Sequence, residues 1–249
     1  MITEWDYTDL AKAYLKRPDY SDVAIDRMID LVGVKPGDKA CDVGAGTAHL
    51  TLMLAKRHLD VVSVEPNNEM RKHGKIRTKE LLNVVWREAI GEDTGQPDNT
   101  FDIVTFGSSF SVTDRPKTMR EVARILKENG WLAVMWNHRD LDDPIQSAIE
   151  NIIRDAIPQF EYGTRREDQT GIINKSGLFG EVTKIQASVI HQQKIGDVIE
   201  AWRSHGTLHR QAGEKFDEII YSIQNMLKGL DKDPIEIPYT TRIWIAQLN

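Results

Sequence analysis

The sequence predicts an α/β protein built on a Rossmann-like, doubly wound sheet that is mostly parallel. Short apolar runs alternate with helical patterns between residues 33 and 140, which is typical of consecutive βαβ units. The first run, residues 39–43, leads into a glycine turn and a helix that begins near Ala48. The second run, residues 60–64, ends in the acidic Glu65. Together these observations predict a small-ligand site at the carboxyl edge of the sheet.

The glycine turn is the first candidate binding element. Gly44 and Gly46 permit positive φ and close approach of a ligand to the backbone. The turn is expected to present free N–H groups at the start of the following helix. Glu65 follows Gly44 by about 20 residues, the offset at which an acidic side chain accepts hydrogen bonds from ribose hydroxyls. The pattern therefore favours a nucleotide or nucleoside ligand.

Two residues narrow the choice of ligand. A dinucleotide turn usually has a third glycine three residues after the second, and His49 stands at that place. Asp42 puts a carboxylate at the end of the strand, which suits a cationic group better than a pyrophosphate. S-adenosylmethionine (SAM) offers such groups, because it carries an ammonium and a positive sulfonium. These residues favour SAM over a nicotinamide dinucleotide.

The remaining strands and helices follow in order along the chain. Apolar spacing predicts a helix over residues 21–32, with Ser21 as its cap and Gly33 as its stop. Further helices are expected at residues 67–79 and 115–127, the latter ended by Asn129 and Gly130. Strands three, four and five are expected at residues 83–86, 101–106 and 131–136, and the last two at residues 181–191 and 238–248.

Several segments resemble the class I SAM-dependent methyltransferases, and in particular the type 11 small-molecule enzymes related to trans-aconitate methyltransferase. The similarity covers nearly the whole chain. The segments that carry it are DVGAGT (42–47), VEPNNEM (64–70), RPDY (17–20), PDNTFD (97–102), EVARILKENG (121–130), WN (136–137) and PYTTR (238–242).

This resemblance implies a seven-stranded sheet whose last strand is antiparallel, with SAM as cofactor and S-adenosylhomocysteine as product. It implies an apolar contact to adenine from Met70 and backbone contact near Ala89. Ile90 stands where relatives often have an acidic residue, so the adenine contacts are an open point. The expected cofactor-binding residues are Asp42, Gly44, Ala45, Gly46, Thr47, Glu65, Pro66, Met70, Ala89, Ile90, Gly107 and Ser108.

Composition limits the other function classes. With 249 residues of which 40% are hydrophobic, the chain is long enough for one α/β domain with insertions. A net charge of −6 argues against nucleic acid as a partner. The single cysteine, Cys41, falls in a predicted core strand, which excludes an internal disulfide and fits a reducing cytoplasm. Neither an export signal nor an 18-residue apolar stretch is apparent, so a cytoplasmic, membrane-free protein is expected.

Residues 1–20 are expected to form a flap over the pocket, as the resemblance implies. Seven residues separate Tyr7 from Tyr14, which places both on one face of a helix over about residues 8–16. Arg17 offers a planar fork to a carboxylate or phosphate, and Tyr20 follows it. These four residues are candidate substrate contacts. The alternative is that the aromatic side chains only pack the flap onto the sheet.

Candidate catalytic and substrate-binding residues follow the fourth and fifth predicted strands. The fourth is followed by a segment with Ser109 and Ser111, where many relatives have a histidine. We expect Ser109 to contact substrate and Ser111 to serve as a possible catalytic group, although serines are also ordinary turn residues. The fifth is followed by Asn137, a candidate substrate contact, and His138. Histidine titrates near neutral pH, which makes His138 the candidate general base.

Two insertions, residues 141–180 and 196–232, are expected to form a helical cap over the active site. The first contains a predicted helix over residues 144–157, and the second an amphipathic helix with Ile219, Ile220 and Ile223 on one face. Arg203 and His205 are further candidate anion contacts, with plain surface exposure as the alternative. One domain spanning residues 1–249 is predicted. It consists of the flap, a cofactor-binding core (33–140), the two insertions and the last two strands. No metal site is expected, because no ligand cluster has suitable spacing.

The predicted function is methyl transfer from SAM to a small, anionic metabolite at oxygen or nitrogen. In-line placement of nucleophile and methyl can supply on the order of 7 to 11 kcal/mol of the barrier, so a strong base is not essential. Two alternatives stay open: a SAM-binding partner or sensor without catalysis, and a nicotinamide-dependent oxidoreductase. A small-molecule substrate and a monomer or homodimer are expected.

Overall fold

The computed structural model of the chain describes residues 6–249, without the side chain of residue 165. The strands are β1 (Lys39–Val43), β2 (Asp60–Val64), β3 (Val84–Arg87), β4 (Phe101–Gly107), β5 (Leu126–Arg139), β6 (Thr183–Gln193) and β7 (Ile235–Gln247). The α-helices are α1 (Ala11–Tyr14), α2 (Asp22–Val32), α3 (His49–Lys56), α4 (Asn68–Arg77), α5 (Arg115–Ile125), α6 (Pro144–Ala156), α7 (Thr170–Lys175), α8 (Ile195–Arg203), α9 (Gly206–Ala212) and α10 (Phe216–Lys228). Short 3-10 turns lie at Thr8–Leu10, Phe110–Val112, Gly163–Arg166 and Gly213–Lys215.

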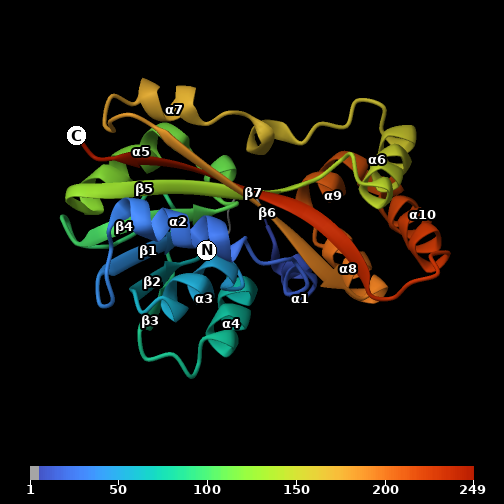
Figure 1. Cartoon of the computed structure of the whole chain (residues 1–249), viewed down its shortest axis with the longest axis horizontal. Helices are drawn as coiled ribbons and strands as arrows, with labels where there is room; N and C mark the ends of the chain where they lie inside the picture. Colours follow the sequence, from blue (N-terminus) through green and yellow to red (C-terminus); the bar gives the residue numbers. More distant parts are fainter. Residues whose placement is uncertain (1–5) are drawn as a thin grey trace.

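One seven-stranded sheet organises the molecule, in the order β3-β2-β1-β4-β5-β7-β6. Strands β1 to β5 pair in parallel, whereas β7 is antiparallel to both of its neighbours. The strand order changes direction at β1 and β4, which brings their carboxyl ends together at a crevice where open α/β sheets bind ligands. Helices flank both faces of the sheet (Figure 1). The predicted Rossmann-like fold with an antiparallel last strand is confirmed.

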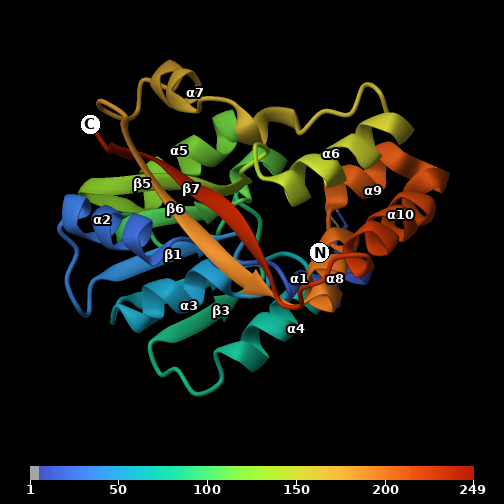
Figure 2. The same cartoon turned by 45° about the vertical axis from the view of Figure 1, so that its right-hand side comes forward.

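The cap is a group of four helices, α6, α8, α9 and α10, gathered at one end of the sheet in both Figures 1 and 2. Strands β6 and β7 run on from the sheet to the cap as an antiparallel ribbon, so residues at their far ends help to form its core. This core is separate from those of the sheet and is built from apolar helix faces. Its buried members include Ile149, Ile153, Phe160, Val198, Trp202, Leu208, Ile219, Ile220, Ile223, Leu227, Ile235 and Ile237.

Only part of the first predicted cap insertion belongs to the cap. Helix α6 joins it, but α7 lies at the opposite end of the sheet near α5 (Figure 1). Ile173 of α7 is fully buried in the same core as Phe179 and residues of β4 and β5. Assigning all of residues 141–180 to the cap was therefore wrong. The chain between α6 and α7 instead crosses from the cap to the sheet.

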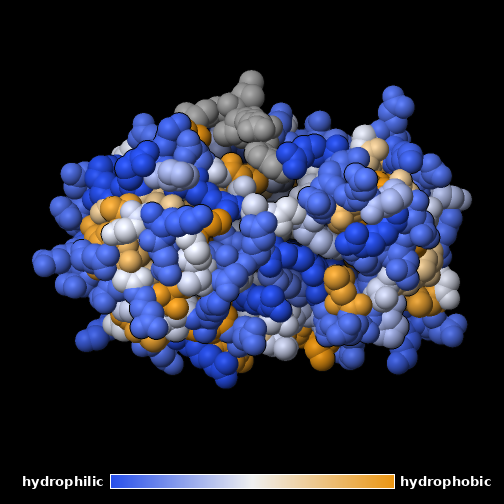
Figure 3. All heavy atoms as spheres, turned by 90° about the horizontal axis from the view of Figure 1, so that it is seen from above, coloured by the Kyte–Doolittle hydropathy of each residue, from blue (hydrophilic) through white to orange (hydrophobic). Residues whose placement is uncertain are grey.

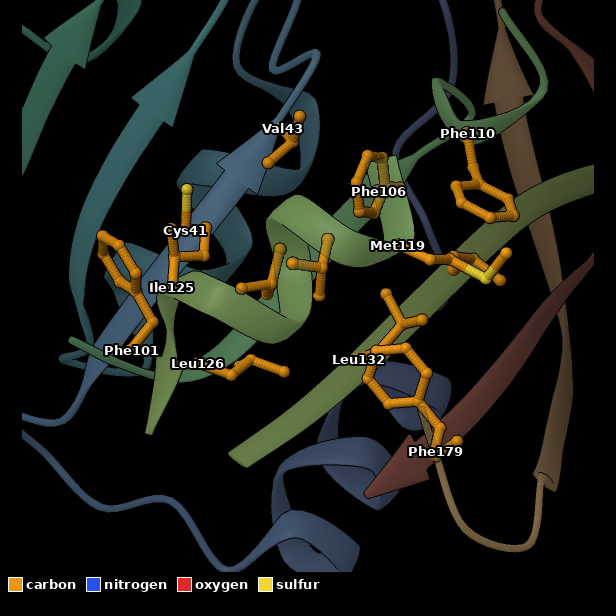
Figure 4. Packing of buried hydrophobic residues seen from close by; sticks show 14 of the residues in the cluster. Cys41, Val43, Phe101, Phe106, Phe110, Met119, Ile125, Leu126, Leu132 and Phe179 are labelled. Carbon is orange, nitrogen blue, oxygen red and sulfur yellow. The ribbon is translucent and has the colours of Figure 1, made fainter. Parts of the chain in front are cut away.

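The core between the sheet and α5 holds the carboxyl ends of β1 and β4 in place. Phe101 and Phe106 of β4 and Leu132 of β5 are fully buried there and lie toward Met119 and Ile125 of α5 (Figure 4). Burying such side chains contributes about 1.5 to 3 kcal/mol each. The dense packing makes this edge of the sheet a rigid base for ligand contacts.

Cys41 belongs to the same core, as the sequence predicted. It is fully buried in β1, and burial raises the pKa of its thiol well above the ordinary value. A protonated, inaccessible thiol is inert, because the thiolate is the reactive form.

One predicted helix end was wrong. Helix α5 ends at Ile125, because Leu126 has extended backbone and pairs with Phe101 of β4. Asn129 has a positive φ of 62° and lies within β5 instead of closing the helix. Ser21 is the N-cap residue of α2, but its side chain makes no capping hydrogen bond. Elsewhere, expected and observed helices and strands differ mainly at their ends: β6 begins and ends later than predicted, and β7 begins earlier.

The surface seen in Figure 3 is mostly hydrophilic, and its hydrophobic residues are scattered in small groups. Isolated groups of this size are normal for a folded protein. Among residues 6–249 no helix combines the length and the apolar character needed to cross a bilayer. Over the same residues, no group of three or more histidine, cysteine or acidic side chains is arranged to hold a metal ion.

The contact of α4 with β3 gives a first prediction. A Cβ added at Gly74 would lie 2.1 Å from the Trp86 ring, whose Nε1–H is fixed by a 2.9 Å hydrogen bond to Thr78 Oγ1. Gly74→Ala is expected to lower the free energy of unfolding by roughly 1 to 3 kcal/mol, because the rigid indole must shift. Urea unfolding measures the loss. Gly196→Ala is the matched control, since a helical Cβ there meets nothing within 4 Å, and equal stability of the two variants would contradict the packing.

Candidate active site

A cavity of about 670 Å³ opens at the carboxyl edge of the sheet. Its walls come from the glycine turn, the ends of β2, β4 and β5, the flap and the cap. The described flap comprises residues 6–20. The predicted site residues that line this single cavity are Tyr7, Tyr14, Arg17, Tyr20, Asp42, Gly44, Ala45, Gly46, Thr47, Glu65, Pro66, Met70, Ile90, Gly107, Ser108, Ser109, Ser111, Asn137, His138 and His205.

The glycine turn uses most of its own backbone donors. Gly44 and Gly46 have φ values of 68° and 56°, as a turn with two left-handed residues requires. The N–H groups of Gly44 and Ala45 both donate to the Val64 carbonyl, at 2.8 and 3.0 Å. The Gly46 N–H donates to Glu65 Oε2 at 2.8 Å. The expectation of free N–H groups was therefore wrong for these three residues, because they bind the end of β2.

Glu65 joins the turn to the start of α4. Besides the bond from Gly46, its Oε1 accepts the Asn67 N–H at 2.9 Å, and the carboxylate is only 6% exposed. Burial raises the pKa of Glu65 to about 6, although the two backbone hydrogen bonds oppose the rise. Each carboxylate oxygen keeps further acceptor capacity toward the cavity. The side chain is thus fixed at the cavity wall by the turn and by the start of α4.

Asp42 is a second buried carboxylate in the same part of the cavity. Its Oδ2 accepts from the Thr51 hydroxyl at 2.7 Å and its Oδ1 from the Thr105 hydroxyl at 3.2 Å. Burial raises the pKa of Asp42 to about 6. No arginine or lysine among the described residues pairs with it. A negative charge held in this way favours a cationic ligand group.

One further observation agrees with SAM as the ligand of this cavity. The Thr47 hydroxyl lines the cavity, is buried and has no hydrogen-bond partner in the structure. A buried hydroxyl of this kind costs free energy unless a ligand satisfies it. Met70 supplies an apolar wall, because its Cε lies 3.4 Å from the position of a Cβ at Gly46. Acceptors, an anionic group and an apolar wall are the features that a nucleoside with a cationic tail needs.

The flap is fastened to the core at several points. The Tyr20 hydroxyl lies 2.9 Å from Ser108 Oγ, and His49 Nδ1 lies 2.7 Å from Asp19 Oδ1. Ser108 itself has a φ of 66°, an unusual conformation for a residue with a side chain. Burial raises the pKa of Tyr20 above its ordinary value. Tyr20 is thus a neutral donor or acceptor that closes the cavity beside the cofactor residues.

Arg17 and Asn137 line the cavity, yet their polar groups are used within the protein. Arg17 donates from Nε to Ser204 Oγ at 2.9 Å and from Nη2 to the Ser204 carbonyl at 2.7 Å. The Asn137 amide donates to the Asp19 carbonyl at 2.8 Å and accepts from Thr241 Oγ1 at 2.6 Å. Both residues therefore tie the flap to other elements. This role was not foreseen, and it competes with the predicted substrate contacts.

The ends of β4 and β5 meet at the centre of the cavity. Ser109 donates to the Val43 carbonyl, so its hydroxyl is already engaged, while Ser111 lies in the short turn after it. His138 at the end of β5 is 7% exposed and lines the cavity. This placement is compatible with the predicted role of His138 as a general base. Whether His138 or Ser111 takes part in catalysis stays a prediction.

Two predicted site residues lie outside the cavity. Arg203 faces a shallow depression beside α1 and α10 and pairs with Glu200, with Nε to Oε1 at 3.2 Å. It sits at the end of α8, turned away from the side that carries Trp202 into the cap core. Ala89 is buried but is not part of the cavity wall, which is formed by Ile90, Gly91 and Glu92 instead.

Residues of the cap side were missed. Arg139 follows His138 directly, and Tyr162 and Arg166 come from the segment that crosses between α6 and α7. Each arginine lies over an aromatic ring, at 3.8 Å from Trp202 and 4.1 Å from Tyr162. The only sequence signal for Arg139 was its position after the fifth strand. Tyr162 and Arg166 belong to the insertion that was expected to cover the active site, but which of its side chains reach the cavity depends on the packing of the cap and could not be predicted from local pattern.

Comparisons with known proteins find methyltransferases. Residues 41–134 match the family described as methyltransferase domain. An uncharacterized methyltransferase of Mycobacterium bovis is 34% identical over 124 residues, covering 50% of this chain and 48% of the relative. The ubiquinone/menaquinone biosynthesis C-methyltransferase of Vibrio campbellii is 32% identical over 129 residues, covering 49% and 50%. The chain thus spans about half the length of the curated relatives it matches.

Solved structures extend the likeness to the whole fold. A protein assigned as a type II methyltransferase from Anaeromyxobacter dehalogenans has a TM-score of 0.68 at 18% identity, covering 93% of this chain and 97% of its own. A Haemonchus contortus phosphoethanolamine N-methyltransferase, in complex with phosphomonomethylethanolamine and S-adenosylhomocysteine, has a TM-score of 0.58 at 14% identity, covering 100% and 60%. Residues 41–134 thus match a methyltransferase domain, and the fold of the chain is the one seen in these solved methyltransferases.

The buried Asp42 gives a second prediction. Its pKa of about 6 in the folded protein exceeds the ordinary 3.8, so the ionised carboxylate destabilises the folded state above pH 6. Without ligand, Asp42→Asn is expected to be more stable than wild type by about 2 kcal/mol at pH 7.5. The difference should shrink as the pH falls through 6 and vanish below about pH 4, where both states of the wild type are protonated.

Urea unfolding of both proteins between pH 4 and 7.5 measures this difference. Asp98→Asn is the control, because Asp98 is an exposed carboxylate outside the cavity. A difference between wild type and Asp42→Asn that does not change with pH would contradict a buried, ionised Asp42.

Proposed function

We propose that this protein transfers a methyl group from SAM to a small, anionic metabolite, at oxygen or nitrogen. The carrying observation is the charge arrangement of one cavity. Two buried carboxylates, Asp42 and Glu65, lie on the side of the glycine turn, and the arginines Arg139 and Arg166 line the cap side. A cationic nucleoside and an anionic acceptor would each meet opposite charge. The resemblance to small-molecule enzymes related to trans-aconitate methyltransferase agrees with this proposal.

In this proposal Glu65 accepts hydrogen bonds from the ribose hydroxyls, and Asp42 faces the ammonium. Thr47 satisfies its buried hydroxyl on the amino acid end, and Met70 packs on the adenine. When bound, SAM supplies an electrophilic methyl on a positive sulfonium, suited to in-line displacement. The flap bonds of Tyr20 and Arg17 close the cavity against water, which strengthens every charge interaction inside.

The chain's own part in the reaction is placement and, for some acceptors, proton removal. A carboxylate acceptor has no proton to lose, so position alone suffices. An amine or hydroxyl acceptor needs a base, and His138 lies where β5 meets the cavity. The acceptor atom stays open, since one curated relative is a C-methyltransferase and one structural neighbour an N-methyltransferase.

The alternative, a SAM-binding protein without catalysis, rests on one difference from the resembling family. Ser111 and Val112 stand where many relatives of the resembling family have a histidine and an aromatic residue, which would suit a SAM-binding partner or sensor. Turnover separates the two proposals. Release of S-adenosylhomocysteine in the presence of a panel of small acids and amines supports the enzyme, and SAM binding with no turnover on any of them supports the sensor.

Glu65 gives the third prediction. Glu65→Ala is expected to weaken the binding of S-adenosylhomocysteine at least a hundredfold, because both ribose hydroxyls lose their charged acceptor and the turn loses its tie to α4. Calorimetric titration measures the change, with NADH titrated alongside. Glu69→Ala is the matched control, since Glu69 lies four residues away on α4 and outside the cavity. NADH binding by the wild type without S-adenosylhomocysteine binding would instead point to an oxidoreductase.

His138 gives the fourth prediction. For an amine or hydroxyl acceptor, His138→Gln is expected to lower kcat by about 10²-fold, since proton removal is lost, with the KM for SAM unchanged. His209→Gln serves as control, because His209 is exposed and outside the cavity. Initial rates at saturating SAM measure the effect. Equal rates for the His138 variant and wild type would remove His138 from the chemistry and favour a carboxylate acceptor.

A further inference from the structure

Arg139 and Arg166 form a pair of cavity arginines that no predicted contact explains. Arg139 is the last residue of β5, and Arg166 ends the short turn Gly163–Arg166. Both side chains are partly buried and line the cap side of the cavity. They come from segments far apart in the sequence and are brought together only by the cap.

Among the described residues, the two guanidinium groups have aromatic neighbours but no hydrogen-bond or ion-pair partner. Across residues 6–249, neither makes a hydrogen bond or an ion pair with a described residue, and their recorded contacts are with aromatic rings. Other arginines of the cavity region differ: Arg17 is held by Ser204, and Arg77 donates to the Thr47 carbonyl at 2.7 Å. A partly buried guanidinium whose donors have no partner among the described residues is costly unless a ligand or solvent accepts them.

The two arginines are close enough to repel each other. Burial lowers the pKa of Arg166, and the positive charges of Arg139 and Arg242 lower it further. The positive charges of both arginines also lower the pKa of the Tyr162 hydroxyl, against the effect of burial. Two like charges in one cavity are stabilised together by a ligand that carries matching negative charge.

The carboxylate whose charge acts on Arg166 already has other partners. Glu150 of α6 accepts the hydroxyl of Tyr162 and pairs with Arg154, with Oε1 to Nε at 2.7 Å. Glu161 also lines the cap side, but it is an exposed residue. Among the described residues, no carboxylate forms an ion pair with Arg139 or Arg166.

The aromatic rings hold both arginines in advance of binding. The Arg139 guanidinium lies 3.8 Å above Trp202, which is 2% exposed and stacked on His205 at 5.2 Å. Stacking fixes the plane of the guanidinium while its N–H groups stay at the edge, where an oxyanion can bind in bidentate fashion. His205 Nδ1 accepts the Leu208 N–H at 3.2 Å, so its Nε2 carries the proton and is a donor.

We propose that Arg139 and Arg166 together bind a doubly charged oxyanion of the methyl acceptor, either two carboxylates or one phosphate monoester, at a point remote from the methylated atom. This proposal rests on the proposed function and specifies its substrate. An oxygen gripped by two guanidinium groups is a poor nucleophile, so the acceptor atom lies elsewhere in the substrate. The arginine pair then supplies remote binding energy that orients the acceptor.

The test is calorimetric titration with probes that differ in charge. Wild-type protein is titrated with succinate, with succinamate and with inorganic phosphate at pH 8, in the presence and absence of S-adenosylhomocysteine. Succinamate has nearly the shape of succinate but one negative charge fewer. We expect succinate or phosphate to bind at least tenfold more tightly than succinamate. Tighter succinate binding identifies a dicarboxylate, and tighter phosphate binding a phosphate monoester.

Substitutions of the two arginines test where the dianion binds. Arg139→Met and Arg166→Met keep an apolar stem on the aromatic ring but lose the charge, and each is expected to weaken the dianion at least tenfold. Arg139→Lys and Arg166→Lys keep the charge without the planar fork and should fall between. Arg120→Met is the control, since Arg120 is exposed on α5 and outside the cavity.

Three results would overturn the proposal: no dianion binding to wild type, neither succinate nor phosphate binding more tightly than succinamate, or dianion binding unchanged in both methionine variants. Thermal unfolding of each variant excludes loss of fold as the cause of a weaker signal. Failure of the cofactor proposal looks different, because S-adenosylhomocysteine would not bind wild type while the anion titrations still report on the arginine pair.

Discussion

The buried Glu65 carboxylate is the interaction on which the candidate site depends. It accepts N–H groups from the glycine turn and from the start of α4, so it fixes two loops at the crevice between β1 and β4. Its cost is visible in the pKa of about 6 that burial imposes. A carboxylate kept charged at neutral pH in such a place is poised to accept further hydrogen bonds. Hydrogen bonds from ligand hydroxyls would offset this cost of burial.

Charge is divided along the cavity. Acidic groups gather on the sheet side, where the turn is rigid and densely packed, and basic groups gather on the cap side, where the walls come from a second core. The flap spans the two halves, because Tyr20 contacts Ser108 of the sheet and Arg17 contacts Ser204 of the cap. A reaction between a cationic donor and an anionic acceptor needs this separation. The same arrangement explains how a chain with net charge −6 can offer a basic pocket.

The sequence predicted the sheet side well and the cap side poorly, for a physical reason. The glycine turn, Glu65 and the carboxyl ends of β4 and β5 are set by local pattern, since a parallel sheet brings strand ends to one edge. The cap depends on how separate helices pack, which no local pattern fixes. Arg203 was therefore placed in the site although it faces away, and Arg166 was not, although its turn crosses the cavity. Hydrogen bonds between residues far apart in the sequence, such as that of Arg17 with Ser204, could not be predicted from local pattern either.

The most direct test of this account is a crystal structure of the protein with S-adenosylhomocysteine. The account predicts both ribose hydroxyls within about 3 Å of the Glu65 carboxylate, with the amino group toward Asp42 and the adenine against Met70. Binding of the nucleoside anywhere else, or a Glu65 that makes no contact with the ribose, would contradict the assignment of the cavity.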